Sequence, residues 1–224
     1  VALARAAEMN AFFVNVTKDP DGTVMSHACA AVFTGQGVLL ADPAFRWFGV
    51  PHQQFRILDD LQTAAFLCFY NRAGDPRELA ACRAGLKLWP DFVQGQLSLV
   101  GALGGARRMV EARQVLADIN EPQAQDLEAA RYWSYQGMIA AHEHRWTEAE
   151  AHLRRSVAID ARGGGTYFNL GSLYWQQHRW AEARTALRAY LRHDPRPLNA
   201  AIARHYIAQI NEKIGFDSAS DAPE

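Results

Sequence analysis

The stretch WSYQGMIAAHEHRWTEAEAHLRRSVAIDA (residues 133–161) returns 34 residues later as YFNLGSLYWQQHRWAEARTALRAYLRHDP (167–195). Small, aromatic and acidic residues match between the copies: Gly137 and Gly171, Trp146 and Trp180, Asp160 and Asp194. Each copy has the pattern of a helix pair, which cannot bury its apolar face alone. Stacked pairs bury one continuous core, so the repeat predicts an all-α superhelix.

Weaker copies extend the repeat toward the N-terminus. Glu111-Ala112 occupies the same slot 37 residues before Ala149, and LQTAAFLCFYNRAGDPRELAACRAGLKLWP (61–90) forms a further copy. LNAAIARHYIAQINEKIG (198–215) is an amphipathic helix in the place of a solvating cap. We therefore predict about four helix pairs and a capping helix over residues 61–215, followed by a disordered polar tail, 216–224.

The C-terminal copy resembles the tetratricopeptide repeat, whose pattern is a bulky residue, Leu-Gly, Tyr, Ala and Pro. The matching residues are Tyr167, Leu170, Gly171, Tyr174, Ala183 and Pro195. The resemblance implies a groove for a protein or peptide partner. Inner-helix candidates for its lining are Gln136, Asn169, Ser172 and Gln176, which include no lysine for a carboxylate clamp.

Residues 1–60 mix helix and strand signals, which favours an α+β unit. VALARAAEMN (1–10) reads as the tail of an Ala-rich helix, so we expect the natural protein to begin upstream of Val1. AFFVNV (11–16), TVMSHACAAVF (23–33) and GVLLADP (37–43) are rich in aromatic and β-branched or apolar residues and predict antiparallel strands.

The last two of these strands predict a hairpin that brings a histidine near an aspartate. If Gly35-Gln36 is a two-residue turn, paired residues have numbers summing to 71, and Cys29 lies opposite Asp42. Strand alternation then puts His27 on the face of Cys29, with Asp42 as its diagonal neighbour. Such a carboxylate orients an imidazole that takes a proton from a nucleophile.

This arrangement resembles the transglutaminase-like branch of the papain-like thiol enzymes over residues 1–45. The family's His-Ala-Trp-x-Glu-Val and Trp-Val-x-x-Asp-Pro strands become His27-Ala28-Cys29-Ala30-Ala31-Val32 and Val38-Leu39-Leu40-Ala41-Asp42-Pro43. The resemblance implies that residues 1–60 are part of such a domain, with His27 and Asp42 as catalytic residues. It places the nucleophilic cysteine about eight residues upstream of Val1.

Two functions follow from these patterns. The first is a transglutaminase-like cysteine hydrolase or acyltransferase acting on protein or peptide amides, fused to a repeat scaffold. The alternative is a non-catalytic adaptor whose repeats bind protein and whose N-terminal domain is degenerate. Cys29 is a second candidate nucleophile, but a strand centre lacks the helix N-terminus that lowers a thiol pKa, so we interpret it as a core residue.

Composition excludes several other classes. The formal net charge is -1 with both signs mixed along the chain, which argues against nucleic-acid binding, and no apolar run is long enough to span a membrane. Three scattered cysteines form no disulfide framework and favour a reducing compartment such as the cytoplasm, and the Ala- and Arg-rich composition suggests a bacterial source. His142, His144 and His178 read as turn residues rather than zinc ligands, and we expect no metal or cofactor.

Overall fold

The computed structural model of the chain describes residues 1, 5, 8–21, 24–34, 37–42, 45–69, 77–120, 127–193 and 197–214. The chain divides into two compact units, Val1–Gly95 and Gln96–Glu224. The predicted disordered tail, 216–224, lies outside the described residues, as do residues 2–4, 6 and 7 of the predicted helix over residues 1–10. The prediction is wrong at the end of that helix, because Glu8 has a positive φ of 60° and Asn10 already belongs to the first strand.

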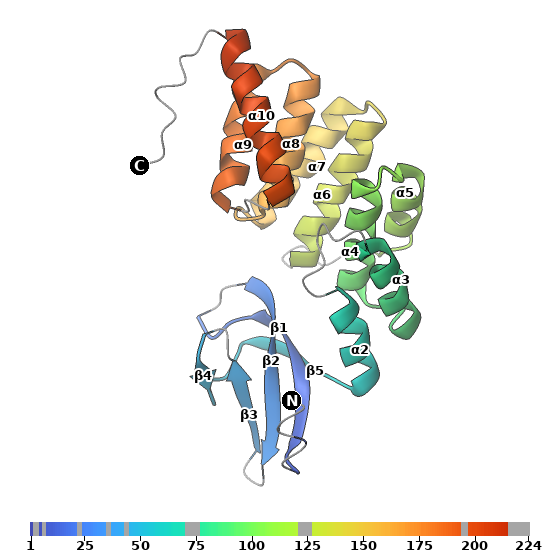
Figure 1. Cartoon of the computed structure of the whole chain (residues 1–224), viewed down its shortest axis with the longest axis vertical. Coiled ribbons are helices and arrows are strands. Elements are labelled where there is room, and N and C mark those ends of the chain that lie inside the picture. Colours follow the sequence, from blue (N-terminus) through green and yellow to red (C-terminus); the bar gives the residue numbers. More distant parts are fainter. Residues whose placement is uncertain are drawn as a thin grey trace. The chain divides into compact units, whose positions relative to one another are not determined.

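The first unit contains a five-stranded sheet (Figure 1). Its strands are β1 (Asn10–Lys18), β2 (Val24–Thr34), β3 (Gly37–Asp42), β4 (Trp47–Phe48) and β5 (Gln54–Leu58), in the order β4-β3-β2-β1-β5. All described pairings are antiparallel. The sequence predicted β1, β2 and β3 but not β4 and β5. β4 has only two residues, and β5 (QFRIL) has one buried residue, so neither strand shows a clear alternation of apolar and polar residues.

The register of the β2–β3 hairpin agrees with the prediction. Thr34 pairs with Gly37, Val32 with Leu39 and Ala30 with Ala41, so each pair of numbers sums to 71. The alternation of side chains follows from this register, because a slip of one residue would move every side chain to the other face.

The two faces of the sheet bury different apolar clusters. On one face, Val14, Val16, Cys29, Ala31 and Leu40 pack together. The other face contributes to a second cluster, together with α2 (Asp60–Phe69) and the segment that follows α3 (Glu78–Leu88). The members of this cluster are Phe13, Ala28, Leu58, Phe66, Phe69, Trp89 and Phe92. The first helix pair is thus joined to the sheet through a common apolar core.

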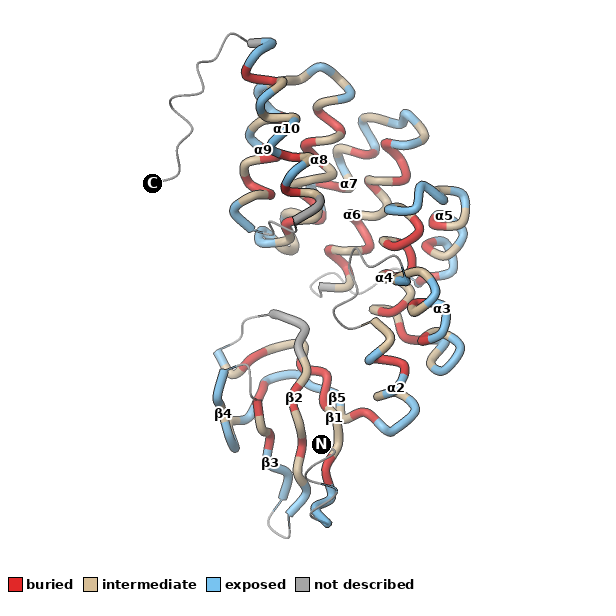
Figure 2. The backbone as a smooth tube through the Cα atoms, in the orientation of Figure 1, coloured by how far each residue is buried: buried red, intermediate tan, exposed pale blue. Residues whose placement is uncertain are grey.

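The remaining helices are α4 (Val93–Gly105), α5 (Met109–Ala117), α6 (Leu127–His142), α7 (Trp146–Ile159), α8 (Gly164–Gln176), α9 (Trp180–His193) and α10 (Pro197–Ile214). Figure 1 shows α6 and α7, then α8 and α9, as antiparallel pairs, and in Figure 2 buried positions recur along each of these helices. This alternation is the helix-pair architecture that the 34-residue period predicts.

Glycines let the two helices of a pair approach closely. A Cβ added at Gly137 would lie 2.5 Å from Leu153 Cγ, and one added at Gly171 would lie 2.6 Å from Leu187 Cγ. Leu153 and Leu187 are both fully buried. The repeated glycine is therefore required by helix packing, since no larger residue fits without a shift of its neighbours.

The turns inside the pairs α4–α5, α6–α7 and α8–α9 are also repeated in detail. A residue with positive φ is followed by an arginine that forms an ion pair with the glutamate three residues later. The positive-φ residues are Arg107, His144 and His178; the ion pairs are Arg108–Glu111, Arg145–Glu148 and Arg179–Glu182. The upstream copy at Glu111-Ala112, predicted from sequence, thus has the same local structure as the two clear copies.

Buried polar contacts join successive pairs. Ser156 Oγ on α7 donates to the carbonyl oxygen of Ala130 on α6 (2.7 Å) and lies 2.8 Å from Thr166 Oγ1 on α8. Because Ser156 has one hydroxyl proton, Thr166 donates in the second bond. Three neighbouring helices are therefore tied at one fully buried side chain.

Candidate functional site

The hairpin positions predicted as catalytic are only partly described. His27 lies in β2 opposite Val16 of β1, and its side chain is outside the described part of the chain. Asp42 ends β3, and its side chain is fully buried. The register places position 27 on the face of β2 that carries Cys29, toward the end of the sheet where Asp42 lies. The geometry of a His27–Asp42 contact stays a prediction.

The structure instead shows a second histidine at Asp42. His52, in the segment before β5, places its Nε2 3.1 Å from Asp42 Oδ2 and 3.9 Å from Asp19 Oδ1. Asp19 follows β1 directly. All three residues are buried, with exposed fractions of 3% for Asp19, 1% for Asp42 and 5% for His52. Sequence reasoning missed Asp19 and His52, because neither belongs to a motif and both lie outside the strands.

Cys29 borders this cluster and is a poor candidate nucleophile. Burial, followed by the negative charges of Asp42 and Asp19, raises the pKa of the Cys29 thiol to about 12. Since the thiolate is the reactive form, almost none is available at neutral pH. This agrees with the interpretation of Cys29 as a core residue of the sheet.

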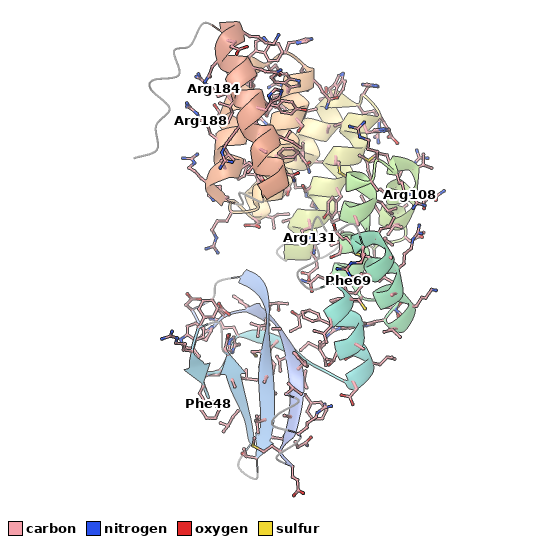
Figure 3. All side chains as sticks on the ribbon, in the orientation of Figure 1. Phe48, Phe69, Arg108, Arg131, Arg184 and Arg188 are labelled. Carbon is pink, nitrogen blue, oxygen red and sulfur yellow. The ribbon has the colours of Figure 1, made fainter. Side chains whose placement is uncertain are left out.

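Aromatic side chains surround the same end of the sheet. Trp47 packs edge-on against His52 with ring centroids 5.9 Å apart, and Phe45 stacks on Trp47 at 4.8 Å. Phe45 is exposed, as is Phe48 on the edge strand β4 (labelled in Figure 3). Trp47 therefore covers the imidazole of His52, whereas Phe48, which pairs with Ala41, lies on the other face of the sheet.

The candidate binding face of the repeats lies on α6 and α8. Asn169, Ser172 and Gln176 follow one another at i, i+3 and i+7 on α8, and so share one face of that helix. Asn169 and Ser172 are half-buried and Gln176 is exposed. Asn169 Nδ2 donates to Ser134 Oγ on α6 (3.2 Å), which fixes the two helices side by side.

The 34-residue offset identifies the corresponding positions on α6. Tyr135, Met138 and His142 match Asn169, Ser172 and Gln176, and none of them is buried. Gln136 lies one residue away, at the position of buried Leu170, and its amide donates to Tyr132 Oη in its own helix (2.9 Å). Arg131, labelled in Figure 3, precedes this stripe and donates to Ser98 Oγ (3.2 Å).

Comparison with known proteins identifies the repeat. Residues 165–197 match the family model of the tetratricopeptide repeat, which confirms the repeat predicted for the C-terminal copy. No curated protein matches the chain in sequence. None of the comparisons supports the resemblance of residues 1–45 to transglutaminase-like enzymes.

Several solved structures are similar to the chain. MamA is 17% identical over 71% of this chain and 86% of its own, with a TM-score of 0.45. PilW, described as a type IV pilus biogenesis factor, is 18% identical over 70% of this chain and 78% of its own (TM-score 0.42). YrrB, described as a TPR protein with an unusual peptide-binding site, is 15% identical over 70% and 77% (TM-score 0.39).

Within the described residues, no helix is both long enough and apolar enough to cross a membrane.

Proposed function

We propose that this chain is a protein-interaction scaffold that binds an extended segment of a partner polypeptide on the stripe formed by Tyr135, Met138, Asn169, Ser172 and Gln176. The observation that carries the proposal is the composition of this stripe. It combines amide and hydroxyl groups on α8 with an aromatic and a thioether side chain on the neighbouring helix α6.

These side chains suit an uncharged, extended ligand. Asn and Gln amides each offer two donors and an acceptor, the groups needed to bind a peptide backbone. Tyr135 and Met138 are half-buried, with their ends close to Gly101 and Gly104 on α4, and their exposed parts supply a rigid and an adaptable contact surface respectively. No acid or permanently charged base occurs among the five residues, so we expect affinity to depend little on ionic strength.

A peptide-display selection against the full chain tests this proposal. Selected peptides should lose binding to the double variant Asn169→Ala/Gln176→Ala. They should retain binding to the control variant Thr185→Ala, since Thr185 is exposed on α9, outside the stripe, and its hydroxyl donates to the carbonyl oxygen of Ala181 in its own helix. Equal binding to all three proteins would show that the stripe is not the ligand site.

A second proposal is that residues 1–60 belong to a transglutaminase-like thiol enzyme in which Asp42 orients His27. The hairpin register favours it, because it puts position 27 and Asp42 near the same end of one face. In the complete protein, His27→Ala should then abolish cleavage or transfer of amide substrates while the fold, followed by circular dichroism, is retained. Undiminished amide chemistry in that variant would refute this role of His27.

A further inference from the structure

The topology of the sheet gathers Asp19, Asp42 and His52 at one end. β1 and β3 run in the same direction, because each is antiparallel to β2 between them. Asp19 and Asp42 therefore lie at corresponding C-terminal ends of two strands. β5 runs antiparallel to β1 and pairs Gln54 with Lys18, which brings His52 to the same end. Three residues far apart in sequence meet for this reason.

Their polar atoms converge on a common point. The side chains are 4%, 0% and 0% exposed for Asp19, Asp42 and His52. One ligand atom from each residue lies within 4.8 Å of the other two. The contacts of His52 with the two carboxylates, 3.1 Å to Asp42 and 3.9 Å to Asp19, are both made by Nε2. An imidazolium that bridged two carboxylates would direct a different nitrogen to each, whereas here both oxygens face the same nitrogen.

We infer that Asp19, Asp42 and His52 form a binding site for a divalent transition-metal cation such as Zn²⁺. A tetrahedral zinc site with ligand bonds of about 2.0–2.2 Å holds its ligand atoms roughly 3.3–3.6 Å apart. This is close to the 3.1 and 3.9 Å between His52 Nε2 and the carboxylate oxygens of Asp42 and Asp19. Small movements of buried side chains would complete the geometry. The three protein ligands leave a fourth position for water or another group.

The donor set selects the type of cation. An imidazole nitrogen favours zinc, iron, nickel or copper, whereas Mg²⁺ and Ca²⁺ prefer oxygen ligands alone. Two carboxylates and one neutral imidazole would place two negative charges around a doubly charged ion. The charge of such a cation would balance the charges of the two buried carboxylates.

The inference is independent of the repeat scaffold and competes with the second proposal. A cation bound to Asp42 occupies the carboxylate that a histidine at position 27 would need. If Asp42 serves only to orient a histidine at position 27, zinc should neither bind stoichiometrically nor stabilise the chain; if Asp42 is a ligand, zinc should do both.

The test is a zinc titration of the full chain by calorimetry at pH 7, after treatment with a chelator. We expect one equivalent of tightly bound Zn²⁺ in the wild type. Asp19→Asn, which keeps the shape of the side chain, and His52→Gln, which replaces the imidazole with an uncharged amide, should each weaken it by more than about 100-fold. The matched control is His178→Gln, because His178 is exposed in the turn before α9 and should not alter the titration.

An anomalous-diffraction map of zinc-soaked wild-type crystals provides a readout that needs no variant. A peak between His52 Nε2 and the two carboxylates supports the inference, even if a variant fails to fold. Absence of zinc binding, a peak elsewhere, or equal binding by Asp19→Asn, His52→Gln and the wild type overturns it. In that case the cluster is an acid–imidazole hydrogen-bond network without a metal.

Discussion

Replacing Gly137 with alanine should destabilise the repeat unit, although alanine is the better helix former. In a helix interior the exchange of glycine for alanine favours the helix by about 1 kcal/mol. At this position the new Cβ would lie 2.5 Å from Leu153 Cγ and 3.0 Å from the carbonyl oxygen of Ala149. Ordinary carbon contacts are about 3.5–4.0 Å, so α6 and α7 would have to separate by roughly 1 Å.

The cost of that separation exceeds the gain in helix propensity. Adding a carbon to a well-packed core typically costs about 1–3 kcal/mol. The upper half of this range applies, because one of the three atoms within 3.0 Å, the carbonyl oxygen of Ala149, belongs to the backbone of α7 and cannot rotate away. We therefore expect the free energy of unfolding to fall by about 1–2 kcal/mol, measured by urea unfolding followed at 222 nm by circular dichroism.

Gly105→Ala is the matched control for this experiment. Gly105 is also helical, at the end of α4, and an added Cβ meets no atom within 4 Å. It should leave stability unchanged or raise it by up to about 1 kcal/mol. If Gly137→Ala proves as stable as Gly105→Ala, the close approach of α6 and α7 is not what keeps glycine at this position.

Three further predictions follow from buried and charged contacts. Ser156→Ala should lower the free energy of unfolding by about 1–3 kcal/mol, because the buried carbonyl oxygen of Ala130 on α6 and the hydroxyl of Thr166 on α8 would each lose a hydrogen bond. The control Ser172→Ala should have little effect, and equal losses in the two variants would refute the role of Ser156. The hydrogen bond from Arg179 holds the pKa of Glu150 below its ordinary 4.5, so Glu150→Gln should cost stability above pH 4.5. This difference should shrink as the pH falls below 4.5 and vanish once the pH has passed the lowered pKa of the folded state; a constant difference in acid would contradict the argument. In the native chain a thiol reagent should label Cys68 first, and the buried Cys29 and Cys82 only on unfolding. Mass spectrometry of the labelled peptides measures the order, and labelling of Cys29 or Cys82 in the native chain would contradict the prediction.

The repeat architecture could be predicted from sequence because it is local and periodic. The 34-residue spacing that matches Gly137 with Gly171 determines where two helices approach, and each pair folds mainly against its neighbours. The register of the β2–β3 hairpin could also be predicted from sequence, because a two-residue turn between two strands determines which residues lie opposite each other. These features depend on residues that are close in the sequence.

The cluster at the end of the sheet was decided by tertiary structure alone. Asp19 and His52 lie 33 positions apart in segments without a motif, and their approach requires β5 to pair with β1 across the sheet. A long-range strand pairing of this kind leaves no periodic signal near either residue. The sequence by itself determined the stacked helix pairs and the hairpin, whereas only the folded sheet brought a buried imidazole to two carboxylates.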